Sequence, residues 1–124
     1  LGLARSGNRA PSSANRVRKR AEYLEIQAGG HRVSGDCLVF ILQRREAGAP
    51  VRLGITASRK IGNAVERNRA RRLIREAFRA VFAELPAGLD LVVIVRRPLG
   101  ERKMQAILDE WRRALPRIRR SAGA

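Results

Sequence analysis

The sequence is poor in the residues on which most enzymes and metal proteins depend. Its 124 residues include one cysteine, Cys37, and one histidine, His31. A single cysteine excludes a disulfide within the chain, and a lone histidine with no neighbouring cysteine argues against a zinc site. Nucleophilic catalysis needs a base beside the nucleophile, but His31 follows a pair of glycines. If the protein serves an enzymatic reaction, we expect that its own side chains do not carry out the chemistry.

Long apolar segments and aromatic residues are scarce as well. No run approaches the ~18–20 apolar residues that span a bilayer, and residues 91–95, one of the longest, have only the length of a strand. Residues 1–20 lack the apolar stretch of a secretory signal. A membrane-surface protein would carry a long amphipathic helix with exposed aromatics, and aromatics make up 4% here. We therefore expect a cytoplasmic protein with no membrane partner.

Acidic residues are few, with 11 Asp and Glu against 27 Lys and Arg, which gives a net charge of +16. Such a charge repels itself and favours an anionic partner. Arginine supplies 24 of the cations, and its guanidinium suits bidentate phosphate contacts and stacking on bases. Apolar residues make up 44%, more than a disordered polycation would carry. Nucleic acid is favoured as the partner over an acidic membrane or an acidic protein.

The length fits a single domain. We assign residues 1–15 to a flexible basic N-terminal tail, residues 16–120 to the domain and residues 121–124 to a C-terminal tail. Asn15 is a candidate cap for a helix over residues 16–28, which the pair Gly29-Gly30 would end.

Three apolar segments then predict strands. Residues 31–34 form a short candidate, and residues 37–43 are apolar on both faces, as in a central strand. Residues 51–56 alternate between apolar and polar and are expected to pair with residues 37–43 as a hairpin across a turn at 46–50.

Two helices and one strand complete the pattern. A helix is predicted over residues 64–85, since its apolar positions recur at helical spacing before Pro86 and Gly88. Residues 90–95 read as a buried strand, and a last helix over 101–115 should stop at Pro116. The order α-β-β-β-α-β-α indicates an α+β sandwich, one central sheet with helices packed on it. The strands on either side of the long helix are then candidates for parallel neighbours.

The long helix combines a buried stripe with a cationic ridge. On a helical wheel, Ala70, Leu73 and Ile74 mark the buried side, while Arg72 and Arg75 point the opposite way. A charge run is often only a solvated face. Here like charges one turn apart repel by a few tenths of a kcal/mol per pair, and Glu66 and Glu76 offset only part of this. We therefore expect the helix to bind RNA or DNA, together with Arg59, Lys60 and Asn63 at its start, where helix N–H groups favour phosphate.

Aromatic residues give weaker indications. Tyr23, near Lys19 on the first helix, could stack a base in a basic groove or be a half-buried core residue. Phe40 on a strand and Trp111 on the last helix are more often core residues. Cys37 reads as a small core residue and His31 as a turn residue.

The stretch SRKIGNAVERNRARRLIREAFR, residues 58–79, resembles the signature of the bacterial ribonuclease P protein subunit. The likeness centres on the triplet Arg67-Asn68-Arg69 and extends over nearly the whole chain from Arg16. It implies the element order given above, with a left-handed crossover. It also implies that the protein assists a catalytic RNA, which uses Mg²⁺ to remove the 5′ leader of precursor tRNA, and that the protein alone binds no cofactor.

The resemblance also implies roles for particular residues. The set facing the catalytic RNA comprises Lys60, Asn63, Arg67, Asn68, Arg69, Arg71, Arg72 and Arg75. The charge pattern of the helix and its preceding loop adds Arg59 and Arg79 to the expected RNA-binding residues. The cleft for the single-stranded leader would involve Lys19 and Tyr23, with Leu38, Phe40 and Thr56 as strand candidates. Where the family often has a second aromatic, one turn after Tyr23, this chain has Gln27.

Two other classes of protein compete with this interpretation. A ribosomal or ribosome-assembly protein would share the charge and the small α+β core, but general basicity does not explain the ungapped run from Lys60 to Arg69. A DNA-binding regulator would need a short recognition helix preceded by another helix, whereas the arginine-rich helix here is long and follows a strand.

Overall fold

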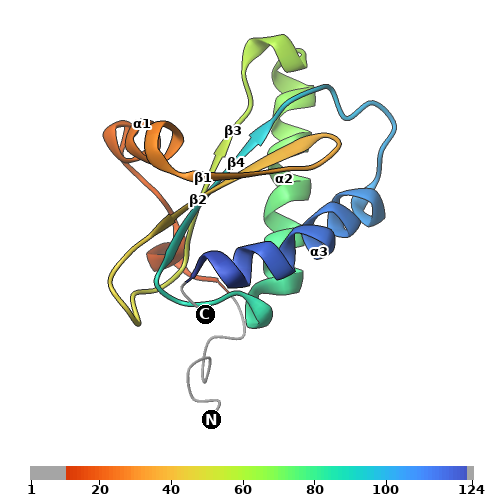
Figure 1. Ribbon diagram of the computed structural model, residues 1–124. Helices are drawn as coiled ribbons and strands as arrows, with labels where there is room; N and C mark the ends of the chain where they lie inside the picture. The colour runs from red at the N-terminus through yellow and green to blue at the C-terminus, as the bar shows by residue number, and fades with distance from the viewer. Residues whose placement is uncertain (1–10, 123–124) are drawn as a thin grey trace.

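The computed structural model describes residues 11–122, which contain one mixed four-stranded sheet; Figure 1 shows its arrangement with the helices. The strands are β1 (His31–Ser34), β2 (Leu38–Arg44), β3 (Arg52–Thr56) and β4 (Leu89–Val95), in the spatial order β1-β2-β4-β3. β2 pairs antiparallel with both β1 and β4, whereas β3 runs parallel to β4. The α+β class, the short first strand and the central position of β2 are confirmed.

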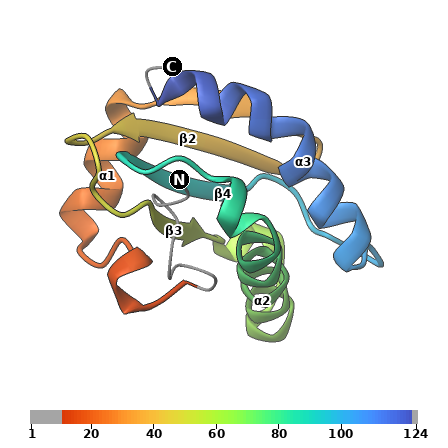
Figure 2. The ribbon, with the colours of Figure 1, turned by 90° about the horizontal axis from the view of Figure 1, so that it is seen from below.

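In the part of the chain that the structure describes, three α-helices cover the two faces of this sheet. α1 (Arg20–Gly29) lies on one face, and α2 (Ala64–Val81) and α3 (Met104–Ser121) lie on the other (Figure 2). α2 connects β3 to β4, and the expected parallel pairing of these two strands is confirmed. Within residues 11–122, none of the helices has the length and apolar character needed to cross a bilayer.

The predicted hairpin between residues 37–43 and 51–56 is wrong. β4 lies between β2 and β3, with Leu91 opposite Leu42 on one side and opposite Leu53 on the other. β4 is buried along almost its whole length, so the central position covers more of its apolar surface than an edge position would. The short turn at residues 46–50 favours a hairpin locally. The free energy gained by burying β4 in the centre of the sheet is larger, so β4 separates the two strands.

The start of the first helix also differs from the prediction. α1 begins at Arg20, and the residues before it are extended: Arg16 forms a bridge with Leu53, and Val17 N donates to Leu53 O at 3.0 Å. Asn15 does not cap α1, because its Nδ2 donates to Val51 O at 2.7 Å. The segment is thus held at the exposed edge of β3. The helix ends at Gly29 with Gly30 as its cap, as expected.

The described residues of the expected N-terminal tail are folded close to the domain. Residues 1–10 lie outside the described residues, but Ser13–Asn15 form a 3-10 turn and Asn15 is buried. At the other end, Ser121 is still part of α3, and residues 123–124 lie outside the described residues.

Both long helices end differently from the prediction. α2 stops at Val81 and a 3-10 turn, Phe82–Glu84, follows it. α3 starts later than expected and continues through Pro116. A proline inside a helix removes one hydrogen bond, but Ala114, Leu115 and Ile118 on either side of it are buried. Their packing offsets the lost hydrogen bond.

The sheet separates two apolar cores. Residues Leu38, Phe40 and Leu42 of β2 face α2 and α3, where Phe40 packs edge-on against Trp111 with ring centroids 5.1 Å apart. The alternate residues Val39 and Ile41 face α1, in a smaller core with Val17, Ile26 and Val92. All the apolar positions predicted for the helix over residues 64–85 are buried: Ala70, Leu73, Ile74, Ala77, Phe78, Val81 and Phe82.

Candidate nucleic-acid interface

The N-terminus of α2 is formed by a reciprocal cap. Asn63 Oδ1 accepts a hydrogen bond from Glu66 N, and Glu66 Oε1 accepts one from Asn63 N, both at 2.9 Å. Gly62 precedes the cap with φ 146°, and a Cβ there would collide with the Glu66 side chain. The side chain of Asn63 therefore caps α2, and contact with RNA at this residue stays a prediction. Arg59 and Lys60, in the 3-10 turn before it, are exposed.

The outward side of α2 displays arginines that the protein itself barely neutralises. We call Arg72, Arg75 and Arg79 the α2 arginine surface; all three are exposed. Within residues 11–122, the one carboxylate that pairs with this surface is Glu76, at 3.9 Å from Arg72 Nε. Arg67 is partly exposed and Asn68 is exposed at the N-terminal end of the same helix. A row of fixed guanidinium groups with so few counter-charges suits phosphate.

Two arginines of the predicted set are occupied within the protein. Arg69 donates through Nη1 to Gly100 O at 3.2 Å and through Nη2 to Arg102 O, so it holds the loop between β4 and α3 against α2. Arg71 donates to Asn68 Oδ1 at 3.2 Å and to Ala57 O at 3.5 Å. An RNA contact by either side chain stays a prediction, and for Arg69 it would compete with these carbonyls.

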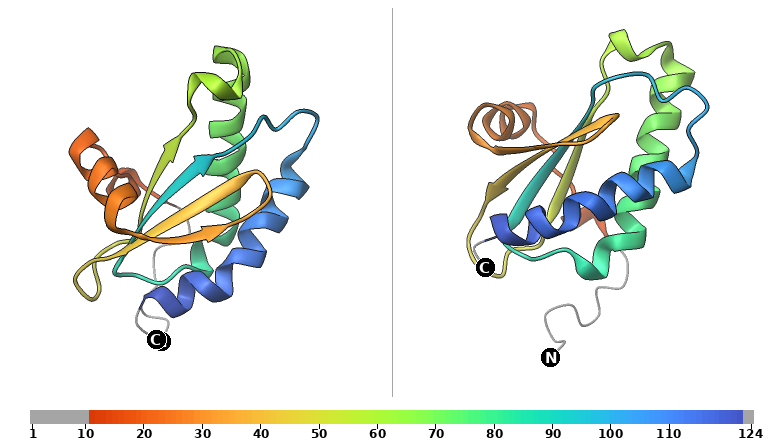
Figure 3. Two further views of the ribbon diagram at one scale, coloured as in Figure 1. Left: turned by 45° about the horizontal axis from the view of Figure 1, so that its top comes forward. Right: turned by 45° about the vertical axis from the view of Figure 1, so that its right-hand side comes forward.

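Tyr23 lies between two adjoining grooves, which together we call the Tyr23 cleft. One groove, of about 580 Å³, runs between residues 11–17, β3 and α2. The other, of about 480 Å³, runs between α1 and β3. Both are lined by Tyr23, Ile55 and Arg71, and Figure 3 (left) shows β3 between α1 and α2. The cleft therefore joins α1 to the arginines of α2.

A glycine positions the aromatic ring in this cleft. Tyr23 is half-buried, and a Cβ on Gly54 of β3 would lie 2.6 Å from Tyr23 Cε1. The ring thus lies directly over the β3 backbone. Gln27, one turn further along α1, accepts a hydrogen bond from Thr56 Oγ1 at 3.4 Å. The position that lacks the second aromatic is therefore polar and linked to the sheet.

The structure separates the predicted cleft residues. Tyr23 and Thr56 line the cleft. Lys19 is exposed at the start of α1 but is not among the lining residues. The prediction that Phe40 and Leu38 line the cleft is wrong, because both side chains are fully buried on the face of the sheet opposite to α1. The alternation of β2 points Val39 and Ile41, not Phe40, toward α1.

Sequence analysis missed several cations of the cleft. Arg16 lines the groove beside α2, together with Arg75 and Arg79, while Arg18 and Arg20 line the groove beside α1. The signal was present in the basic run RVRKR, residues 16–20, but the expected helix would have spread these side chains around its axis. The extended backbone before α1 brings Arg16 and Arg18 to the cleft instead.

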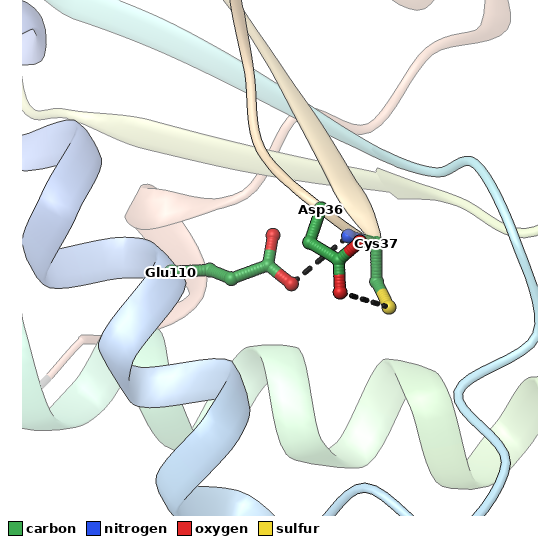
Figure 4. Close-up of side chains that lie close together, drawn as sticks. All are labelled: Asp36, Cys37 and Glu110. Carbon is green, nitrogen blue, oxygen red and sulfur yellow. Dashed lines mark hydrogen bonds between the residues drawn. The ribbon is translucent and has the colours of Figure 1, made fainter.

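Asp36, Cys37 and Glu110 form a cluster with metal-ligand chemistry (Figure 4), their ligand atoms lying within 4.8 Å of one another. Each group already has an internal role. Glu110 accepts hydrogen bonds from Cys37 N at 2.9 Å and Leu38 N at 3.2 Å. Asp36 pairs with Arg102 at 3.0 Å, which lowers the pKa of its carboxyl. Burial raises the pKa of the Cys37 thiol. These contacts identify a structural cluster that fixes the β1–β2 turn to α3.

Comparison with known proteins decides between the candidate classes. The family model for ribonuclease P matches residues 12–119. The chain belongs to the ribonuclease P protein family. It is 43% identical to the ribonuclease P protein component of Gluconacetobacter diazotrophicus over 103 residues, which cover 82% of this chain and 89% of the relative. The component from Oleidesulfovibrio alaskensis is 38% identical and covers 73% of each chain.

Solved structures of ribonuclease P proteins share the fold. The Staphylococcus aureus protein superposes with a TM-score of 0.73 at 32% identity, covering 84% of this chain and 94% of that one. The Thermotoga maritima protein gives a TM-score of 0.75 at 31% identity, covering 83% and 96%. Membership of the ribonuclease P family makes this chain an RNA-binding component of an endoribonuclease complex in tRNA processing, and it does not favour the ribosome-assembly alternative.

Proposed function

We propose that this chain assists a catalytic RNA in removing the 5′ leader of precursor tRNA by binding both RNAs at adjacent surfaces. The observation that carries this proposal is the position of Tyr23. Its ring lies in a cleft whose walls include Arg71, Arg75 and Arg79 of α2. One continuous surface can therefore hold a single strand and contact a second RNA segment.

The Tyr23 cleft suits a single-stranded leader. The half-buried ring offers a stacking face that accepts any base, and Arg16, Arg18 and Arg20 supply cations along the backbone path. Stacking on one aromatic ring contributes about 1–3 kcal/mol per base. Because Gln27 replaces a second aromatic, we expect one stacked base here and a hydrogen-bonded neighbour.

The α2 arginine surface suits the catalytic RNA. Arg72, Arg75 and Arg79 are exposed and project from a helix whose buried side is fixed in the main core. Arg59, Lys60, Arg67 and Asn68 extend the surface toward the start of the helix. Fixed cations placed where two RNA segments meet offset phosphate repulsion, and this lowers the concentration of free Mg²⁺ that the complex needs.

We assign the Mg²⁺ ions to the RNA rather than to this chain. The strongest ligand-type cluster of the described residues, Asp36 with Cys37 and Glu110, is taken up by backbone N–H groups and arginines. Mg²⁺ prefers carboxylate and phosphate oxygens as ligands and keeps several of its waters. The phosphates of the RNA provide such oxygens. The chain's own part is to bind, orient and neutralise.

The test is cleavage of a precursor tRNA by a bacterial ribonuclease P RNA at low Mg²⁺, with and without this protein. We expect the protein to restore cleavage at the correct 5′ position and to cut nothing by itself. Binding of both RNAs without any stimulation of cleavage would contradict the proposal and would favour a general role such as ribosome assembly.

A further inference from the structure

A second cationic groove lies away from the Tyr23 cleft. This β1–α3 groove, of about 720 Å³, lies between the edge strand β1, its neighbour β2 and the C-terminal end of α3. Figure 2 shows that end of α3 on the β2 side of the sheet, whereas α2 lies toward β3. The lining includes His31, Arg32, Arg44, Arg117 and Arg120, and no acidic residue.

The arginines of this groove are largely unpaired. Within the described part of the chain, no hydrogen-bond or ion-pair partner contacts the side chains of Arg32, Arg117 or Arg120, and Arg44 Nε donates to Ser121 O at 3.1 Å. Two other arginines of α3 differ sharply. Arg112 and Arg119 both pair with Glu84, at 3.3 Å each. Arg112 and Arg119 therefore share one carboxylate, whereas Arg117 and Arg120 in the groove have no counter-charge among the described residues.

The helix dipole accounts for only part of this arrangement. Cations in the last turn of a helix are favoured by about 0.3–1 kcal/mol each, which applies to Arg119 and Arg120. Arg32 and Arg44, however, come from β1 and β2 and converge on the same groove. Bringing Arg32 and Arg44 close to the arginine side chains at the C-terminal end of α3 causes electrostatic repulsion unless an anion lies between them.

We propose that the β1–α3 groove binds phosphates of a double-helical stem of the ribonuclease P RNA, distinct from the segment on α2. This inference rests on the proposed function. Arginine side chains match phosphate geometry. No Phe, Tyr or Trp lines the groove, and the exposed imidazole of His31 is its one ring side chain, so phosphate contacts are favoured over stacking of unpaired bases. β1 and β3 are opposite edges of the sheet, about 15 Å apart at ~4.8 Å per strand. The two surfaces thus reach different phosphates, and the protein clamps two parts of its RNA.

The test compares two double variants that remove equal charge from the same helix. Arg117→Ala with Arg120→Ala removes the groove cations, and Arg112→Ala with Arg119→Ala is the matched control. We expect the groove variant to bind ribonuclease P RNA about tenfold more weakly and to reduce the slope of log K against log salt by about 1.8, from two lost phosphate contacts. The control should change the slope by less than half as much. Thermal unfolding of both variants establishes that they are folded.

Three results would overturn the inference. The first is an equal fall in slope for both variants, which would mean a general charge effect. The second is wild-type binding by the groove variant. The third is a loss confined to mature tRNA measured alone, which would place the groove on the substrate instead. The proposed function is tested separately, by the stimulation of cleavage that the wild-type protein gives. If the wild-type protein stimulates cleavage and the groove variant gives one of these three results, the groove inference fails and the proposed function stands.

Discussion

Arg52 and Asp90 lie opposite each other on the parallel strands β3 and β4 and form a bidentate pair, with Nε–Oδ1 at 2.8 Å and Nη2–Oδ2 at 2.7 Å. Asp90 is buried, and Arg45 approaches it at 3.5 Å. The third nitrogen of Arg52, Nη1, reaches Glu22 of α1 at 3.1 Å. The helix that carries Tyr23 is thus tied to the sheet by a shared guanidinium.

Replacing Arg52 should destabilise the protein strongly. Arg52→Ala leaves the buried Asp90 carboxylate with the longer Arg45 contact at 3.5 Å, and breaking a buried pair in this way costs about 3 kcal/mol. Urea unfolding measures the loss. Arg45→Ala is the control, since its contact is longer and its side chain more exposed, and its cost should stay below half of that. Equal costs would mean that the bidentate geometry contributes nothing.

Stability should fall in acid partly through Glu22. The backbone N–H of Lys19 and then the Arg52 guanidinium hold the pKa of this carboxyl below its usual value of 4.5. A carboxyl whose pKa is lower in the folded state stabilises the fold above its unfolded pKa, and this contribution is lost as the pH falls through the folded value. Glu22→Gln should therefore be less stable than wild type at pH 7, with the gap closing below about pH 4. A gap independent of pH would contradict the assignment.

Glu110 should be a structural carboxylate. It is buried and accepts hydrogen bonds from two backbone N–H groups at the start of β2. Glu110→Ala leaves both donors unsatisfied, at a cost of about 2–3 kcal/mol, while Glu110→Gln keeps one acceptor and should lose roughly half of that. Unfolding curves of both variants should show a larger loss of stability for Glu110→Ala than for Glu110→Gln. Added divalent cations should not change the unfolding midpoint of the wild-type protein if the cluster is structural.

Arg69 and Arg72 should behave differently although they are neighbours in the arginine-rich run. Arg69→Ala frees the loop at residues 96–103, so we expect faster amide hydrogen exchange there and a small change in the salt slope for RNA. Arg72→Ala removes an exposed cation with one weak pair, so we expect normal exchange and a slope smaller by about 1. The reverse pattern would assign Arg69 to the RNA and Arg72 to the fold.

Tyr23→Ala should separate substrate from product. Loss of one stacked base weakens binding of a leader-bearing precursor by about 1–3 kcal/mol, and binding of mature tRNA should be unchanged. Tyr23→Phe keeps the ring and should retain most of the affinity, which controls for the hydroxyl group. Equal losses for precursor and mature tRNA would show that Tyr23 acts only as a packing residue.

The sequence predicts this fold well where one helix or strand decides the pattern. The seven apolar positions predicted for the helix over residues 64–85 follow from helical spacing alone, and burial confirms each one. The errors arise where distant segments compete. The partner of residues 37–43 depends on β4, about fifty residues away, and the continuation of α3 past Pro116 depends on packing against the sheet.

The candidate site shows the same division. The exposure of Arg72, Arg75 and Arg79 follows from the helical wheel. The internal hydrogen bonds of Arg69 depend on a loop that follows β4, and no local pattern reveals it. Whether Phe40 points toward α1 or toward α2 and α3 depends on the orientation of β2 in the sheet. Both faces of this strand are buried and apolar, so the alternation of residues along the sequence does not reveal it.

Trp111 gives the protein a built-in optical reporter of its core. It is the one tryptophan of the chain, fully buried, with its ring next to Phe40 and Phe78, and its Nε1 has no hydrogen-bond partner among the described residues. Indole emission therefore follows the packing of the sheet on α2 and α3, while the side chains of the α2 arginine surface are exposed on the outward side of α2. Unfolding can be followed by tryptophan fluorescence in the presence of RNA, whereas RNA titrations need a dye attached elsewhere on the protein.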